Sequence, residues 1–182
     1  MMHNKNLTLS LARYPDLRLR AINKKDLENL RNWKNENKKS FFLKEDITAE
    51  KQQRWYAAFN SREHDHMFIV EQQVGEEWMP IGCMGFRMLA DEGAVDGYNI
   101  IRSKKIGIAS FTMSEAFRLM LAYAASIYTG FPVRVKVLSG NPAVAWYQKN
   151  DFTILSEQDG YYAMELDKAS VNDFKEFIKT AI

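Results

Sequence analysis

Apolar and polar residues alternate along several short stretches of the chain, as they do in half-buried strands. The stretch Leu17-Arg18-Leu19-Arg20-Ala21-Ile22 shows this period of two clearly. Gly82 and Gly85 interrupt one apolar stretch, which predicts a bulge or a close approach by a neighbouring segment. The pattern predicts about seven strands. They cover residues 17–22, 66–71, 78–88, 94–101, 133–138, 152–156 and 161–166.

Apolar residues at helical spacing predict five helices between these strands. Asn23, with Asp26 three positions later, is expected to cap the first helix, and Thr48 the second. Asn141 is expected to cap the fourth, with Pro142 in its first position. The helices are predicted over residues 24–35, 48–62, 110–128, 143–150 and 170–181.

The order of these elements predicts an α+β fold with a mostly antiparallel sheet flanked by helices. The strand at 133–138 follows a long helix, so it is expected to run parallel to the strand at 94–101. Two parallel strands that diverge at such a crossover leave a gap in which ligands bind. We expect one domain over residues 1–182, with its core in 17–166 and residues 1–15 at the periphery.

The composition narrows the class of protein. The chain has 182 residues, 46% of them hydrophobic and 26% charged, and a formal net charge of +2. This charge is too small to indicate a nucleic-acid partner, and no apolar stretch approaches the roughly 18 residues of a membrane span. Cys83 is the only cysteine and the three histidines lack metal-ligand spacing, so we expect no disulfide and no metal site. A cytoplasmic protein is expected, and the oligomeric state is left open.

The stretch from Arg102 to Ser110 connects a predicted strand to a predicted helix. Such a turn leaves backbone N–H groups without partners, and with the helix dipole behind them they can bind an anion. Lys104 and Lys105 add positive charge there. The alternative is an ordinary turn with two solvated lysines.

Two motifs resemble those of the GNAT superfamily of acetyl-CoA-dependent N-acetyltransferases. Lys104-Lys105-Ile106-Gly107-Ile108-Ala109 is similar to the pyrophosphate loop Gln/Arg-x-x-Gly-x-Gly/Ala, with Lys104 in place of the first residue. The stretch from Asn141 to Phe152 resembles the second motif, although Asn141 and Tyr147 are one residue closer than usual and Asp151 replaces a glycine. The resemblance covers residues 17–166 and implies a GNAT-like sheet with a splayed parallel pair at the cofactor site.

The first half of the chain resembles one branch of that superfamily. Leu30-Arg31-Asn32-Trp33-Lys34-Asn35 is similar to a segment of acetyltransferases that act on nucleotide-linked amino sugars or on the N-termini of ribosomal proteins, with Lys34 in place of an arginine. The resemblance implies acceptor contacts from Trp33, Asn35 and Glu45. Lys34 and the Lys38-Lys39 pair, together with Trp33 and Asn35, fit an acceptor site that carries phosphate. The alternative is a solvated basic face.

The resemblance also implies a cofactor site and two catalytic groups. Tyr147 would be the acid that protonates the departing thiolate, unless it is only a core aromatic and Tyr161 or Tyr162 takes this role. Asp96 would be the base; strict alternation places it on one strand face with Tyr98 and Ile100. The alternative is that Asp96 is a solvated carboxylate without a catalytic role. In that case Glu45, Asp46, His64 or His66 would be the base. The implied acetyl-CoA contacts are Asn99, Ile100, Ile101, Lys104, Lys105, Ile106, Gly107, Ile108, Ala109, Ser110, Asn141 and Tyr147.

The expected function is therefore N-acetylation of a small-molecule amine, with a nucleotide-linked amino sugar as one candidate acceptor. A protein N-terminus or lysine is the first alternative, and it would need an open groove between the loop after the first helix and the hairpin at 156–161. A nucleotide-linked sugar would need a basic pocket there. A non-catalytic acyl-CoA-binding module is the second alternative, and it would lack a carboxylate and a tyrosine near the thioester.

Overall fold

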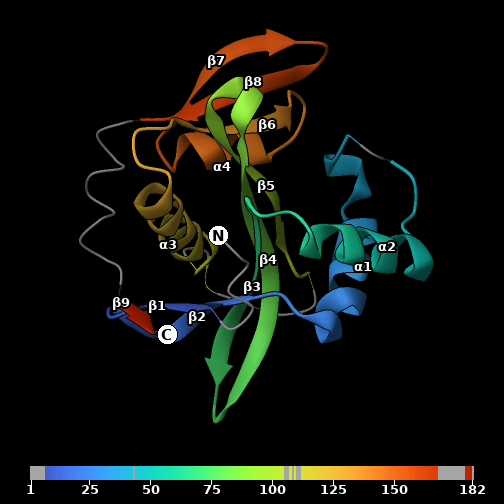
Figure 1. Ribbon diagram of the computed structural model, residues 1–182, viewed down its shortest axis with the longest axis vertical. Helices are drawn as coiled ribbons and strands as arrows, with labels where there is room; N and C mark the ends of the chain where they lie inside the picture. The colour runs from blue at the N-terminus through green and yellow to red at the C-terminus, as the bar shows by residue number, and fades with distance from the viewer. Residues whose placement is uncertain are drawn as a thin grey trace.

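A computed structural model describes residues 7–42, 44–104, 107, 109, 112–167 and 179–181. In this part of the chain one mixed sheet has nine strands, in the order β7-β8-β6-β5-β4-β3-β2-β1-β9 (Figure 1). The strands are β1 (Thr8–Leu11), β2 (Tyr14–Ala21), β3 (Asp65–Val74), β4 (Glu77–Leu89), β5 (Ala94–Arg102), β6 (Val133–Leu138), β7 (Phe152–Gln158), β8 (Tyr161–Leu166) and β9 (Lys179–Ala181).

All seven predicted strands are present, and the fold class is confirmed. The first correction concerns the N-terminus: β1 pairs with β2, and Leu7, Leu9 and Leu11 are at most 5% exposed, so residues 7–15 are not peripheral. The second concerns the predicted C-terminal helix at 170–181. Residues 179–181 form β9 on the free edge of β1, because backbone pairing at that edge outweighs local helix propensity. Residues 168–178 lie outside the described part of the chain.

The helical segments begin close to the predicted caps. Asn23 and Asp26 form a capping box, and the Thr48 side chain accepts a hydrogen bond from the backbone N–H of Lys51. The α-helices are α1 (Leu27–Glu36), α2 (Ala49–Asn60), α3 (Thr112–Ile127) and α4 (Ala143–Gln148), and short 3₁₀ turns are η1 (Lys24–Asp26), η2 (Lys38–Ser40) and η3 (Ala90–Glu92).

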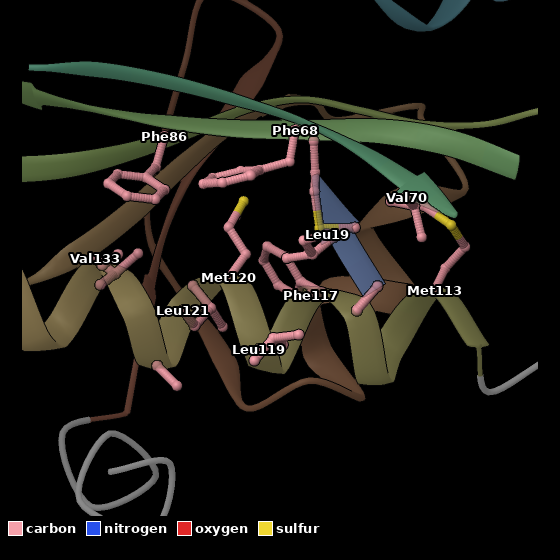
Figure 2. Packing of buried hydrophobic residues seen from close by; sticks show 14 of the residues in the cluster. Leu19, Phe68, Val70, Phe86, Met113, Phe117, Leu119, Met120, Leu121 and Val133 are labelled. Atoms are coloured by element: carbon pink, nitrogen blue, oxygen red, sulfur yellow. The ribbon is translucent and has the colours of Figure 1, made fainter. Parts of the chain in front are cut away.

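Helices cover both faces of the sheet and divide the core in two. α3 lies on one face, and α1 and α2 lie on the other (Figure 1). On the α3 face, Phe68 and Phe86 point from β3 and β4 toward Met120 of the helix (Figure 2). On the opposite face, Met67 and Ile69 belong to a second buried cluster with residues of α1 and α2. Because β3 is buried on both faces, the centre of the sheet is a firm support for the residues at its rim.

Candidate active site

A cleft opens where β5 and β6 diverge. The two strands are parallel, as predicted, but they pair only from Val95–Val133 to Gly97–Val135. After Val135, β6 continues to pair with β8. After Gly97, β5 is no longer paired with β6, and the chain goes on to α3. The resulting cleft has a volume of about 800 Å³ and is lined from both strands, from α1 and from the start of α4.

A bulge in β5 forms one wall of this cleft. Tyr98 pairs with Gly85 and Ile101 with Cys83, so β5 has one more residue than β4 between these pairs. Asn99 adopts a left-handed backbone with φ of +50°. Neither it nor Ile100 has a partner in the register with β4. The bulge therefore leaves backbone groups of both residues outside the ladder, where they line the cleft.

The bulge also corrects the predicted strand face. Asp96 and Tyr98 follow the alternation, but Ile100 packs with the α3-side core, while Tyr98 and Ile101 pack with the cluster under α1. The extra residue reverses the side on which the following side chains lie. The predicted close approach at the glycines is present, since a Cβ on Gly82 would lie 2.4 Å from the carbonyl oxygen of Ile101.

Tyr147 reaches the cleft from α4. Its ring packs against Phe117 and Phe152, and the residue is 8% exposed. Burial, reinforced by the nearby Asp96 carboxylate, raises the pKa of Tyr147 well above its ordinary value. Its hydroxyl is therefore protonated at neutral pH and is placed to donate a proton into the cleft.

Asp96 lines the same cleft from β5. Arg87, directly opposite on β4, holds the Asp96 carboxylate through Nη2 at 2.9 Å and Nε at 3.0 Å. Burial nevertheless raises the pKa of Asp96, and the Arg87 charge only partly offsets this shift. A carboxylate with a raised pKa is a better proton acceptor than a solvated one, and Asp96 is not a solvated edge residue as the alternative assumed.

The loop after α1, residues 37–42, crosses the cleft and contacts its far side. The Asn141 Nδ2 donates to the carbonyl of Ser40 at 3.0 Å, while its Oδ1 accepts from the N–H of Ala143 at 2.9 Å. The ring of Phe42 meets that of Tyr161 edge-on at 5.7 Å. The capping position of α4 is Pro142 and not Asn141 as predicted, but the Asn141 side chain still pairs with the first N–H of the helix. It also fixes the loop to the second half of the molecule.

The three predicted acceptor contacts lie outside the cleft. Trp33 is 4% exposed and packs in the core, because α1 needs a large apolar residue on its sheet-facing side. Asn35 holds the backbone of Ile47 through two hydrogen bonds of 3.0 and 2.8 Å. Glu45 is exposed and pairs with Lys51. In this structure Trp33 is a core residue, Asn35 a loop anchor and Glu45 a surface residue.

Most cations of the cleft were not selected from the sequence. Of the described charged residues that line it, five are basic and one, Asp96, is acidic; the basic ones are Lys34, Arg87, Arg102, Lys104 and Lys136. Arg87 pairs with Asp96, and Lys136 pairs with Glu92 in solvent at 3.0 Å. The alternation of apolar and basic residues in β6 is the sequence signal that could have revealed Lys136.

The predicted diphosphate loop is described only in part. Lys104 lines the cleft, and its Nζ donates to the carbonyl of Glu36 at the end of α1, at 3.2 Å. Gly107 and Ala109 are exposed. The remaining predicted contacts in this loop, Lys105, Ile106, Ile108 and Ser110, lie outside the described residues.

The alternative acids and bases do not line the cleft. His64 contacts the Tyr128 hydroxyl at 3.2 Å, and His66 stacks on Phe86 at 4.7 Å, on the α3 side of the sheet. Asp46 pairs with Lys38 at the surface. Tyr162 packs against the α3-side core. Two of the described tyrosines, Tyr98 and Tyr147, do line the cleft. The Tyr98 hydroxyl donates to the Asp65 carboxylate, so Tyr147 is the tyrosine that remains as the candidate acid, with Asp96 as the lining carboxylate.

The structure gives no indication of a bound metal or of a membrane-spanning helix within its described part. No group of three or more His, Cys, Asp or Glu side chains there is arranged to hold a metal ion. None of the helices described above is long and apolar enough to cross a membrane.

Comparison with known families agrees with this architecture. The model of the acetyltransferase (GNAT) domain matches residues 16–153, which include the cleft and both motifs. The chain therefore belongs to the GNAT acetyltransferase family. As a member of this family it is an acyltransferase. A search of curated proteins with this sequence found no match.

Several solved structures share the fold. Apo FdhC, a nucleotide-linked sugar GNAT, is 18% identical, with a TM-score of 0.73 and 94% of each chain covered. Spermidine N-acetyltransferase from Vibrio cholerae, in complex with CoA and spermine, is 19% identical, with a TM-score of 0.71 over 86% of this chain and 98% of that one. A domain from Methanocaldococcus jannaschii is 18% identical, with a TM-score of 0.70 over 82% and 97%. At these identities the likeness shows the fold alone.

Proposed function

We propose that this protein transfers the acetyl group of acetyl-CoA to a primary amine of a small molecule that also carries a negative charge, such as a nucleotide-linked amino sugar. One observation carries the proposal: the cleft between β5 and β6 brings Tyr147 and Asp96 together among an excess of cations. The single domain and the cytoplasmic location expected from the sequence remain predictions.

The described residues fit an acyl-CoA in this cleft. The bulge would present backbone groups of Asn99 and Ile100, which have no register partner on β4, to the thioester and the pantetheine arm. Lys104 and Arg102 supply positive charge near the start of the diphosphate loop. The cofactor would supply the activated acetyl group. Asp96 would take the proton from the acceptor amine, since only a neutral amine attacks, and Tyr147 would give its proton to the departing sulfur.

The charge of the cleft supports an anionic acceptor over a polyamine. A polyamine carries several positive charges and would be repelled by the lysines and arginines that line the cleft, whereas a phosphate would be attracted. One similar structure is of a spermidine N-acetyltransferase and another of a nucleotide-linked sugar GNAT. Among the described lining residues the one carboxylate, Asp96, is held by Arg87, so none is left to pair with a polyamine, which favours the second kind of acceptor.

The two alternatives lose support from specific contacts. A peptide acceptor needs an open groove between the loop after α1 and the hairpin of β7 and β8, but Phe42 contacts Tyr161 across this interval. A non-catalytic module would lack a carboxylate and a tyrosine at the cleft, and Asp96 and Tyr147 both line it. We therefore retain the small-molecule enzyme as the proposal.

An acceptor screen tests this proposal. Amines are incubated with acetyl-CoA and the protein, and release of the CoA thiol is followed. We expect nucleotide-linked amino sugars to be acetylated with a kcat/KM at least about 100-fold above that of spermidine, because unfavourable charge alone costs several kcal/mol. A preference for spermidine, or for peptides, would contradict the proposed acceptor class.

Lys136 and Glu92 provide a matched pair of variants for the same assay. Lys136→Gln should raise KM for the anionic acceptor about tenfold, because a hydrogen bond to a charged group contributes about 1.5–3 kcal/mol. Glu92→Gln removes the competing carboxylate 3.0 Å from Lys136 and should lower that KM. KM for acetyl-CoA should stay the same in both. Equal changes in the two variants would show that Lys136 does not contact the acceptor.

A further inference from the structure

Lys34 is a half-buried lysine that reaches from α1 into the cleft. Its Nζ lies 2.6 Å from Oδ1 of Asn99 and 3.3 Å from the ring centre of Phe41. It thus connects three parts of the site: helix α1, the loop after it and the bulge of β5. The proposed function uses none of these contacts.

The partner of Lys34 is the residue on which the bulge depends. Asn99 has φ of +50°, a conformation that asparagine tolerates better than most residues but does not prefer. Its carbonyl oxygen accepts a contact from Cys83 Sγ at 3.4 Å, and its side chain accepts from Lys34. These two contacts hold Asn99 from two elements, Cys83 on β4 and Lys34 on α1.

The position of Lys34 has a cost in stability. Burial lowers the pKa of the Lys34 ammonium to about 8, and the one titratable group that opposes this shift among the described residues is Cys83. The Cys83 thiol is itself neutral, because burial raises its pKa to about 12. The charge on Lys34 is therefore poorly compensated in the folded state, which is unusual for a residue that only supports the fold.

We propose that Lys34 is a positioning residue for acetyl transfer: by holding the Asn99 side chain, it keeps the bulge of β5 in the conformation that presents its backbone to the thioester. The inference rests on the proposed function, because the reaction must occur in this cleft. In this proposal the Lys34 ammonium holds the bulge in place and does not bind the acceptor.

The inference predicts opposite effects on activity and on stability. Lys34→Met keeps a long unbranched side chain but removes the charge, its contact with the Phe41 ring and the hydrogen bond to Asn99. We expect kcat to fall about 10- to 100-fold, because misplacement of the groups that orient a thioester has effects of this size. We expect KM for acetyl-CoA to stay within about twofold of wild type. Because an uncompensated buried charge is removed, Tm should rise by about 3 °C.

A double-mutant cycle tests the route through Asn99. The wild type, Lys34→Met, Asn99→Ala and the double variant are compared in kcat, KM and Tm. The effects of residues that act through one contact do not add. The loss of kcat in the double variant should therefore be no larger than the loss in the less active of the two single variants. Lys24→Met, an exposed lysine on η1 outside the cleft, is the matched control and should change neither kcat nor Tm.

Each result bears on a different claim. A kcat of Lys34→Met within twofold of wild type would overturn the inference, and so would a full product of the two single losses in the double variant. If Lys34→Met does not fold, Lys34 has a structural role and the inference is overturned on stability; Asn99→Ala with unchanged kcat would overturn it independently. No acetyl transfer in wild type and in Lys24→Met would contradict the proposed function itself, and with it this inference.

Discussion

Replacing Tyr147 by phenylalanine is expected to lower kcat about 100-fold while leaving the affinity for acetyl-CoA nearly unchanged. The loss is the usual size for removal of a general acid. The affinity should hold because the ring keeps its packing against Phe117 and Phe152, so the wall of the cleft stays in place. The measurement is steady-state release of the CoA thiol, with cofactor binding measured separately by calorimetry.

Two other tyrosines make this prediction specific. Tyr123→Phe removes a hydroxyl on α3, where the ring packs against Phe68 and Phe86 away from the cleft, and should have no effect on kcat. Tyr162→Phe tests the rival acid on β8. Full activity in Tyr147→Phe together with a loss in Tyr162→Phe would move the acid to the hairpin and contradict the assignment.

Replacing Asp96 by asparagine is expected to lower kcat by a similar factor, about 100-fold, and to change the pH profile. Because burial raises the pKa of Asp96, the wild-type rate should fall on acidification at a pH above the ordinary range of an aspartate. The carboxylate accepts a proton only when it is ionised, so the loss appears as pH decreases through the raised pKa. Asp96→Asn has no such group and should lose this acidic limb.

An exposed carboxylate in the preceding turn serves as the control for Asp96. Asp91 lies on η3, and Asp91→Asn should keep both the rate and the acidic limb. If Asp96→Asn keeps the acidic limb of the wild type, another group is the base. Arg87→Gln removes the ion pair of 2.9 Å with Asp96. Its loss should raise the pKa of Asp96 further, so the acidic limb of the pH profile should move to higher pH.

The sequence predicted the central strands because their local pattern and their burial agree. β2 and β6 alternate between apolar and charged residues, and in the structure the apolar positions are the buried ones. β1 was missed because its four residues contain only two buried leucines, Leu9 and Leu11, and these contribute to the core only when β1 is paired with β2. β9 depends entirely on pairing with β1, which no local pattern of three residues can reveal.

The sequence indicated side chains of the cleft but not the contacts between elements. Asp96 of β5 and Tyr147 of α4 were chosen through the family resemblance, and both line the cleft; their catalytic roles stay predictions. The bulge at Asn99 was not foreseen, because an extra residue is defined by the register with β4. Lys34 was considered as a substitution for an arginine and as an acceptor contact, but its contact with Asn99 could not be predicted, because Asn99 is 65 residues away in the sequence.

Calorimetric titration of the protein with acetyl-CoA tests whether the cleft between β5 and β6 binds the cofactor. We expect saturable binding of one molecule per chain at a concentration below about 1 mM, competed by free CoA. It also predicts nearly the same affinity for Tyr147→Phe, because the hydroxyl acts on the departing sulfur and not on binding. Absence of binding at millimolar acetyl-CoA would contradict the assignment of the cleft between β5 and β6 as an acyl-CoA site.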